Sequence, residues 1–234
     1  MEESTINSSI LGTKEYWENL YQQEINNYLD HSDPGEIWFG KGLTMKMVKW
    51  IKSKSSQLLP DDGDQIKILD LGCGNGHLLY SLYQQGYTDL TGLDYADKSI
   101  KLVNQMASDL GIVNNLKTYV ADVLTLYKSN LIPERIKFNL IIDKGTFDAI
   151  CLNPDLDLNQ VKSDYLATLE AILFKGRSFF MIASCNWTKD ELINMFTKSS
   201  QSFLSLYDEI ETPQFSFGGS KGNNVTCLIF QRLS

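Results

Sequence analysis

From residue 65 onward, short apolar segments of strand length alternate with amphipathic segments of helix length, and this alternation constrains the fold more than any other feature. Strands separated by helices of this length need crossover connections, which produce a parallel sheet covered on both faces. The last two predicted strands are joined by a glycine-rich loop and must therefore be antiparallel to each other. The prediction is a doubly wound α/β fold. Its strands are predicted at residues 66–71, 90–94, 116–121, 138–143, 178–183, 203–210 and 225–231, and its helices at residues 77–85, 98–110, 160–174 and about 188–198.

The residues before this region predict an N-terminal helical extension. Thr13 is suited to cap a helix over residues 14–29, and apolar side chains recur at helical spacing over residues 43–55. We interpret the aromatic stripe of the first helix as core packing. The predicted organisation is a disordered N-terminus at residues 1–12 and a single domain at 13–234, in which a helical cover (13–64) precedes the α/β core (65–234).

Length and charge exclude several classes of protein. A chain of 234 residues is long enough for one sizeable α/β domain and short for two. A net charge of −8, without any basic cluster, disfavours direct binding of nucleic acid. No segment approaches the roughly 18 consecutive apolar residues of a membrane span, and the polar N-terminus does not resemble a signal peptide. We therefore expect a protein that contacts neither membranes nor nucleic acid. A monomer is the default expectation, and the residue types do not determine the oligomeric state.

The cysteines indicate a reducing compartment. Cys73, Cys151, Cys185 and Cys227 are far apart in the sequence, and the chain has only two histidines. This pattern disfavours both a zinc site and a disulfide framework. We predict no metal and a cytoplasmic location.

The sequence ILDLGCGNGHLL places Gly72, Gly74 and Gly76 between the first predicted strand of the core and its helix. Glycines at this turn let the backbone approach a ligand closely. Asp94 ends the next strand, 22 residues after Gly72, where a carboxylate can accept hydrogen bonds from both ribose hydroxyls. Asp70 does not suit a pyrophosphate, but it can bind the ammonium group of an amino acid. The turn therefore favours a nucleoside that carries an amino acid over a dinucleotide.

These residues resemble the cofactor-binding motifs of the class I S-adenosylmethionine-dependent methyltransferases. The glycine motif matches LDLGCGNG, the ribose-binding acid matches Asp94, and the acid beside the adenine matches Asp122 in VADV. The resemblance implies S-adenosylmethionine as the cofactor and a Rossmann-like sheet of seven strands, one of them antiparallel. It also implies that adenine packs near Tyr95 and Val123. It covers the chain from about Ile66 to the C-terminus and specifies the cofactor, not the substrate.

The strand after this region ends in a polar turn, DKGTFDAI. Ligands of open parallel sheets bind beyond the carboxyl ends of the strands, so Asp143 is predicted to lie near the cofactor and its reactive methyl group. Methyltransferases that act on adenine or amide nitrogens usually carry Asn/Asp-Pro-Pro-Tyr/Phe here, which makes those substrates a poor match. Thr146 is suited to cap a short helix with Asp148 in its first turn. Lys144 could pair with Asp143 or with Asp148.

Three blocks, LGTKEYWENLY, GEIWFGKG and DKGTFDAI, closely resemble the eukaryotic family that methylates lysine in translation elongation factor 1-alpha. They flank and include the cofactor domain, so the resemblance covers nearly the whole chain. It implies a cytoplasmic protein-lysine N-methyltransferase of the seven-strand type, with elongation factor 1-alpha as its protein substrate.

Lysine methylation makes clear chemical demands on such a site. A lysine amine, with a pKa near 10.4, must lose its proton before it attacks the methyl group, which costs roughly 4–5 kcal/mol at pH 7. Burial beside a cationic sulfonium lowers the amine pKa, and alignment of the reacting atoms supplies much of the remaining catalysis. We hypothesise that the Asp143 carboxylate, or a nearby backbone carbonyl, accepts a hydrogen bond from the amine and orients its lone pair.

Two aromatic pairs are candidates for the lysine entrance, because aromatic faces suit an alkylammonium chain. Trp38 and Phe39 lie in a glycine-bounded loop between the first two helices, and Phe215 and Phe217 lie in the loop between the last two strands. Ordinary packing under a loop is the alternative for both pairs. Asp148 is a further candidate for substrate binding.

Other functions stay open on the sequence alone. A small-molecule methyltransferase would need a pocket enclosed by inserted helices, and no such insert is visible. A cofactor-binding protein that acts only through protein contacts would not need Asp143. A dinucleotide oxidoreductase does not fit Gly-x-Gly-x-Gly together with Asp70. The target lysine and the number of methyl groups added are not determined by residue types.

Overall fold

The structure is a computed structural model that describes residues 7–58, 65–129, 131–132, 136–198, 202–212, 214–217, 220–223 and 225–233, with 214–217 and 220–223 described as backbone alone. Its helices are α1 (Lys14–His31), α2 (Gly40–Ser53), α3 (Ser55–Leu58), α4 (His77–Tyr83), α5 (Asp97–Asp109), α6 (Thr146–Cys151), α7 (Leu158–Ile172) and α8 (Lys189–Thr197), with short 3-10 helices η1 (Ile10–Gly12), η2 (Val113–Asn115) and η3 (Leu126–Lys128). Its strands are β1 (Lys67–Leu71), β2 (Asp89–Asp94), β3 (Leu116–Val120), β4 (Leu140–Lys144), β5 (Phe179–Ser184), β6 (Leu204–Glu209), β7 (Gln214–Phe217), β8 (Ser220–Asn223) and β9 (Thr226–Arg232). Among the helices in these ranges, none combines the length and the apolar character that crossing a membrane requires.

Seven strands form one sheet in the order β3-β2-β1-β4-β5-β9-β6. The pairs from β3 to β5 are parallel, whereas β9 is antiparallel to both β5 and β6. This arrangement confirms the predicted doubly wound, mostly parallel sheet and the antiparallel pairing of the last two predicted strands. All of the strands that run parallel to one another have their carboxyl ends at one edge of the sheet.

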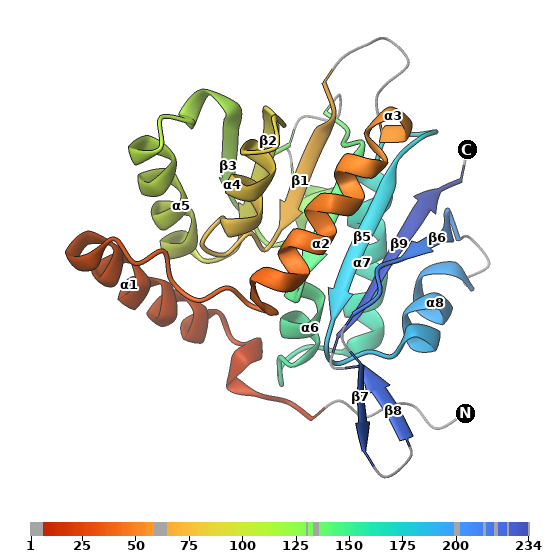
Figure 1. Ribbon diagram of the computed structural model, residues 1–234. Coiled ribbons are helices and arrows are strands. Elements are labelled where there is room, and N and C mark those ends of the chain that lie inside the picture. Colours follow the sequence, from red (N-terminus) through yellow and green to blue (C-terminus); the bar gives the residue numbers. More distant parts are fainter. Residues whose placement is uncertain are drawn as a thin grey trace.

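The sheet separates two apolar cores. In β1 and β4, Ile68 and Ile142 belong to the core formed with α2, α4 and α5, whereas Leu69 and Ile141 belong to the core formed with α6, α7 and α8. Figure 1 shows α2 in front of the sheet, α7 behind it and α1 to one side, next to α5. Because strand side chains alternate between faces, each central strand supplies apolar residues to both cores.

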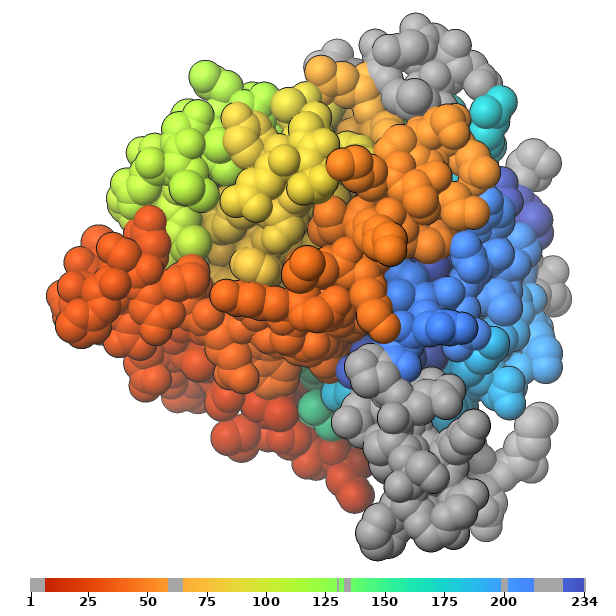
Figure 2. All heavy atoms as spheres, viewed as in Figure 1, coloured from red at the N-terminus to blue at the C-terminus, as the bar shows by residue number. Residues whose placement is uncertain are grey.

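The N-terminal extension is helical, as predicted, and Thr13 caps α1 by accepting a hydrogen bond from Tyr16 N. α1 packs against α5, and α2 packs against α4. In Figure 2 the red and orange spheres of this extension form a continuous band across one face of the molecule. The extension therefore covers the core on the face that holds α4 and α5.

Residues 7–12 differ from the disordered N-terminus that we predicted through residue 12. η1 packs against the end of α6, where Ser9 N donates a hydrogen bond to Leu152 O at 2.9 Å. Gly12 is buried, and a Cβ there would lie 2.2 Å from Asn153 N, so only glycine fits this approach of two backbones. Residues 1–6 lie outside the described ranges.

The loop between β6 and β9 carries a further antiparallel pair, β7 and β8. Since β6 runs parallel to β5, this loop leaves the sheet at the edge that holds the carboxyl ends. Figure 1 shows the hairpin of β7 and β8 beyond the arrowhead of β5, close to α6. The predicted position of this loop is therefore confirmed.

Candidate cofactor and substrate site

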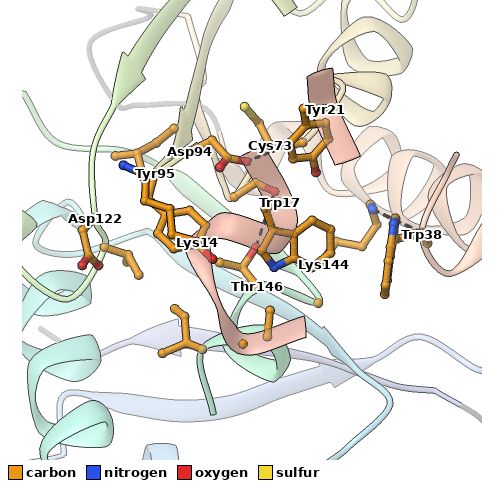
Figure 3. A pocket seen from close by; sticks show the side chains of 18 of the residues that line it. Lys14, Trp17, Tyr21, Trp38, Cys73, Asp94, Tyr95, Asp122, Lys144 and Thr146 are labelled. Carbon is orange, nitrogen blue, oxygen red and sulfur yellow. Dashed lines mark hydrogen bonds between the residues drawn. The ribbon is translucent and has the colours of Figure 1, made fainter. Parts of the chain in front are cut away.

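A cavity of about 330 Å³ lies at the carboxyl edge of the sheet. Its wall comes from the residues that follow β1, β2, β3 and β4, together with η1, α1 and the loop between α1 and α2. Figure 3 shows Asp122 at one end of the cavity, Lys144 and Trp38 at the other, and Asp94 between them. The cavity thus extends across the carboxyl ends of four neighbouring strands, in the order β3, β2, β1 and β4.

The glycine turn after β1 is held between β2 and α6. Gly72 N and Cys73 N donate hydrogen bonds to Leu93 O at 2.7 and 2.9 Å. Thr146 Oγ1 donates to Leu71 O at 2.6 Å. Gly72 has a φ of +67°, and a Cβ there would lie 2.0 Å from Thr146 Oγ1. The backbone of the turn is therefore exposed to the cavity because no side chain intervenes.

Asp94 ends β2 inside the cavity wall and is only 5% exposed. Its Oδ2 accepts a hydrogen bond from Gly74 N at 3.0 Å, and its Oδ1 accepts one from Ala96 N at 2.9 Å. Burial raises the pKa of Asp94, and these two backbone donors oppose that effect. Because each carboxylate oxygen can accept two hydrogen bonds, both oxygens keep one acceptor site for a ligand.

Tyr95, Asp122 and Val123 all line the end of the cavity near β3, as the adenine prediction requires. Val123 is buried, whereas Asp122 is exposed and its Oδ1 accepts a hydrogen bond from Leu124 N at 2.8 Å. The ring of Tyr95 lies 5.9 Å from Lys14 Nζ. The structure therefore brings these three predicted residues together.

Asp70 lies in β1 and is 2% exposed. Among the residues that the structure describes, none donates a hydrogen bond to its carboxylate. Burial raises the pKa of Asp70 to about 7, and the nearby ammonium of Lys144 opposes this rise. Asp70 therefore does not belong to the cavity wall: it is a buried carboxylate two residues before Gly72, and no described residue donates a hydrogen bond to it.

Asp143, predicted as the catalytic acceptor and as a cofactor ligand, does not line the cavity. It is fully buried, and its carboxylate accepts hydrogen bonds from Thr146 N and Phe147 N, each at 2.9 Å, and from the Tyr165 hydroxyl at 2.5 Å. Burial raises the pKa of Asp143 to about 7. It shares the sheet face of Ile141, because side chains alternate along β4. This differs from our prediction, and Asp143 rather than Thr146 caps the start of α6.

Lys144, the next residue of β4, lines the cavity instead. Its Nζ donates a hydrogen bond to Trp38 O at 3.2 Å, and burial lowers its pKa. Within the described residues no ion pair joins Lys144 to Asp143 or Asp148, so neither predicted pairing occurs. The polar turn after β4 therefore presents a cation to the cavity, where we had predicted an anion.

Asp148, predicted as a substrate-binding residue, also lies outside the cavity wall. It is 5% exposed and accepts hydrogen bonds from Ser184 Oγ at 2.5 Å and Cys185 N at 2.7 Å. Burial raises its pKa, and these bonds oppose the rise. Asp148 is in the first turn of α6, as predicted, and connects that helix to the end of β5.

Comparison with known proteins identifies the chain. A model of the methyltransferase domain matches residues 62–223. EEF1A lysine methyltransferase 2 of Homo sapiens is 39% identical over 225 residues, which cover 96% of this chain and 88% of the human protein. The chain belongs to this methyltransferase family. Protein-lysine N-methyltransferase efm4 of Schizosaccharomyces pombe is 33% identical over 97% of this chain and 96% of its own length.

Solved structures of more distant methyltransferases share the fold. Magnesium protoporphyrin IX methyltransferase from Synechocystis, solved with bound S-adenosylmethionine, has a TM-score of 0.63 at 12% identity and covers 98% of this chain and 99% of its own. A TehB-like S-adenosylmethionine-dependent methyltransferase from Corynebacterium glutamicum has a TM-score of 0.57 at 18% identity and covers 94% of this chain and 100% of its own. At such low identity these likenesses describe the fold alone.

The site of this methyltransferase fits its cofactor, S-adenosylmethionine. Asp94 keeps two acceptor sites for ribose hydroxyls. Asp70 is a buried carboxylate that receives no hydrogen bond from the described residues, which suits an ammonium group. A Cβ at Gly72 would collide with Thr146, and a Cβ at Gly74 would collide with Tyr21, so glycine at both positions keeps the backbone of the turn open to the cofactor. Within the described ranges, no group of three or more His, Cys, Asp or Glu side chains is arranged for a metal ion.

The N-terminal cover contributes residues that our sequence analysis assigned to the core. Trp17 and Tyr21 of α1 line the cavity, and the Trp17 ring lies 5.0 Å from that of Trp38. Burial raises the pKa of Tyr21 well above its ordinary value. Helical periodicity marks these side chains as inward-facing but does not distinguish a core from a ligand cavity, so no sequence signal separated the two.

Of the four aromatic residues predicted at the lysine entrance, the structure places one in the cavity wall. Trp38 lines the cavity, whereas Phe39 packs behind it, with its ring 3.0 Å from the position a Cβ of Gly145 would take. Phe39 has a φ of +63°, a strained conformation for a bulky residue. The side chains of Phe215 and Phe217 lie outside the described residues.

Replacing Gly72 with alanine tests the packing of the glycine turn. We expect a loss of about 3 kcal/mol or more in the free energy of unfolding, because strain at positive φ adds to a clash with Thr146. The matched control is Gly86→Ala, since Gly86 has a φ of +92° and nothing within 4 Å of its Cβ position. Urea denaturation of both variants separates the clash from the strain, and equal losses would contradict the proposed packing.

Proposed function

We propose that this methyltransferase transfers methyl groups from S-adenosylmethionine to a lysine side chain of translation elongation factor 1-alpha. The observation that carries the proposal is 39% identity to human EEF1A lysine methyltransferase 2 along 96% of the chain. Protein-lysine N-methyltransferase EFM4 of Saccharomyces cerevisiae, 33% identical over 96% of both chains, supports the same activity. The similarity includes the N-terminal cover, which forms part of the cavity wall.

The residues of the chain have to present lysine as a free, aligned amine. When bound, S-adenosylmethionine supplies an electrophilic methyl group on a sulfonium. The aromatic wall of Trp17, Tyr21 and Trp38 desolvates an entering ammonium group and so lowers its pKa, which offsets part of the roughly 4–5 kcal/mol that deprotonation costs at pH 7.

A backbone carbonyl accepts the hydrogen bond that orients the amine of the substrate lysine. The Asp143 carboxylate is committed to α6 and α7, whereas Lys144 and Gly145 of the same turn line the cavity. A backbone carbonyl at this turn can accept a hydrogen bond from the amine and direct its lone pair toward the methyl group. Of the two acceptors in our hypothesis, the burial and hydrogen bonds of Asp143 favour the backbone carbonyl.

The direct test uses purified elongation factor 1-alpha and methyl-labelled S-adenosylmethionine. We expect label in one lysine-containing peptide of the factor, located by mass spectrometry after proteolysis. The same protein added to a cytosolic lysate should label mainly that factor. Label confined to small molecules would support a small-molecule methyltransferase and contradict the proposal.

We expect Trp38→Ala to raise the KM for the protein substrate about 5- to 30-fold, because aromatic contact with an alkylammonium group contributes roughly 1–2 kcal/mol. The dissociation constant of S-adenosylhomocysteine should change much less. Phe174→Ala is a suitable control, since Phe174 is 47% exposed and precedes β5, at the opposite edge of the sheet. Steady-state kinetics with both substrates check the prediction, and an unchanged KM would remove Trp38 from the entrance.

We also propose that the protein acts in the cytoplasm as a monomer, without nucleic acid. All four cysteines are free, which suits a reducing compartment. The large apolar side chains that are exposed in the described residues are spread along the chain, from Ile10 to Leu233. The net charge of −8 does not favour a polyanionic partner.

A further inference from the structure

Lys144 and Asp70 place opposite charges on the same face of the sheet. Asp70 is paired with Ile142 in the register of β1 and β4, and Lys144 lies two residues beyond Ile142. Since side chains at i and i+2 of a strand share a face, the ammonium and the carboxylate both lie on the α4 side. Lys144 lines the cavity together with Gly72 and Gly74, and its Nζ donates a hydrogen bond to Trp38 O, so its side chain reaches the same cavity as the glycine turn.

The two charges are near each other but do not form an ion pair. Each shifts the pKa of the other, yet their separation exceeds the 4.0 Å of an ion pair. The Asp70 carboxylate has no donor in the described part of the chain. Lys144 Nζ makes one hydrogen bond, to Trp38 O, and an ammonium group has three donors. Both groups therefore keep capacity for a ligand that carries both charges.

Lys144 lines one end of the cavity, and Asp70 is buried next to this end, in β1 on the same face of the sheet. The cavity runs from Asp122, near β3, past Asp94 at the end of β2, to Lys144 at the end of β4 (Figure 3). If adenine lies near Asp122 and ribose at Asp94, the amino-acid part of the cofactor reaches the glycine turn and β4. An α-amino acid carries an ammonium group and a carboxylate on neighbouring atoms.

We infer that Lys144 binds the α-carboxylate of S-adenosylmethionine, while Asp70 receives the α-ammonium group. A cation held away from water stabilises a carboxylate more than a solvated one does, and hydrogen bonds between charged groups are short and strong. Lys144 Nζ keeps its hydrogen bond to Trp38 O and so connects the cofactor to the loop that carries Trp38. This inference rests on the proposed function, since it assigns a residue to the cofactor of that reaction.

The test compares two thioether nucleosides, of which only one has the amino-acid part that Lys144 and Asp70 would bind. S-adenosylhomocysteine carries the amino-acid carboxylate and ammonium, whereas 5′-methylthioadenosine carries neither. For Lys144→Met we expect the dissociation constant of S-adenosylhomocysteine to rise about 10- to 100-fold, the loss expected for a hydrogen-bonded charge pair. The dissociation constant of 5′-methylthioadenosine should stay within about twofold. Isothermal titration calorimetry measures both without requiring methyl transfer.

Two further variants make the comparison sharper. Lys144→Arg keeps the positive charge and should recover a large part of the affinity for S-adenosylhomocysteine. Lys41→Met removes an exposed lysine of α2 and should change neither dissociation constant. Thermal unfolding of each variant, followed by circular dichroism, shows whether the ligand-free protein is folded.

Each other outcome has a definite meaning. Equal weakening of both ligands by Lys144→Met would overturn the inference and leave Lys144 as a support for the Trp38 loop. Wild-type affinity for S-adenosylhomocysteine with a reduced kcat would overturn it and assign Lys144 to the target amine. If the wild-type protein bound neither ligand, the cofactor assignment would fail together with the proposed function, and this result is distinct from the other two.

Discussion

Replacing Asp143 with alanine is expected to lower the free energy of unfolding by about 3–5 kcal/mol, because a buried donor without a partner costs about 1–3 kcal/mol and two buried donors, with a third that is partly buried, lose theirs. The donors are Thr146 N, Phe147 N and the Tyr165 hydroxyl, which all bond to the Asp143 carboxylate. The first two start α6, and the third fixes α7 against β4. Urea denaturation monitored by circular dichroism measures this loss.

The variant Tyr165→Phe provides the matched control for Asp143. It removes one of the three hydrogen bonds and keeps the two that start α6, so it should cost less than Asp143→Ala. Loss of methyl transfer in Asp143→Ala should follow the loss of folded protein. A variant that kept wild-type stability and cofactor affinity but lost activity would restore Asp143 as the catalytic acceptor.

Replacing Asp94 with asparagine is expected to weaken binding of S-adenosylhomocysteine about 100-fold, since two hydrogen bonds to a charged acceptor each contribute about 1.5 kcal/mol or more. The amide group of asparagine is a donor at one position where the carboxylate accepts from Gly74 N or Ala96 N. It therefore disturbs the glycine turn as well as removing an acceptor for the ribose. Calorimetric titration of the purified variant checks this prediction.

Asp97→Asn is the control for Asp94. Asp97 begins α5, and its carboxylate forms an exposed ion pair with Lys101. The substitution removes the same charge three residues away without touching the cavity wall, so affinity for S-adenosylhomocysteine should be unchanged. If Asp94→Asn bound the ligand as well as Asp97→Asn does, the ribose would have to bind elsewhere.

The sheet could be predicted because its signals are local. Each central strand is a short apolar run followed by a helix of ordinary length, and parallel pairing follows from the crossovers. The turn after β1 was predicted as a cofactor site because Gly72 and Asp94 have a recognisable spacing and occur at strand ends. The residue pattern alone is sufficient for such features, because each lies at the end of a strand that a local pattern predicts, and parallel strands bring these ends together.

The reactive end of the site could not be predicted in the same way. Asp143 and Lys144 are adjacent in sequence and therefore lie on opposite faces of β4. Since β4 is apolar on both faces, its sequence does not show which of the two residues faces the cavity. Trp17 and Tyr21 face inward on α1, but whether they meet apolar core or a cavity depends on where α1 packs. α1 packs against α5, which is far from α1 in the sequence, so a local pattern does not predict where α1 docks.

The sequence by itself determined the α/β class, the glycine turn, the acids at the ends of β2 and β3, and the resemblance that implies lysine as the substrate. Periodicity and spacing carry this information, because each is a property of nearby residues. Only the tertiary structure decided that Lys144 faces the cavity, that Asp143 holds α6 and α7, and that α1 supplies part of the wall. Strand register and the docking of distant helices set these positions, and neither is encoded in a local pattern.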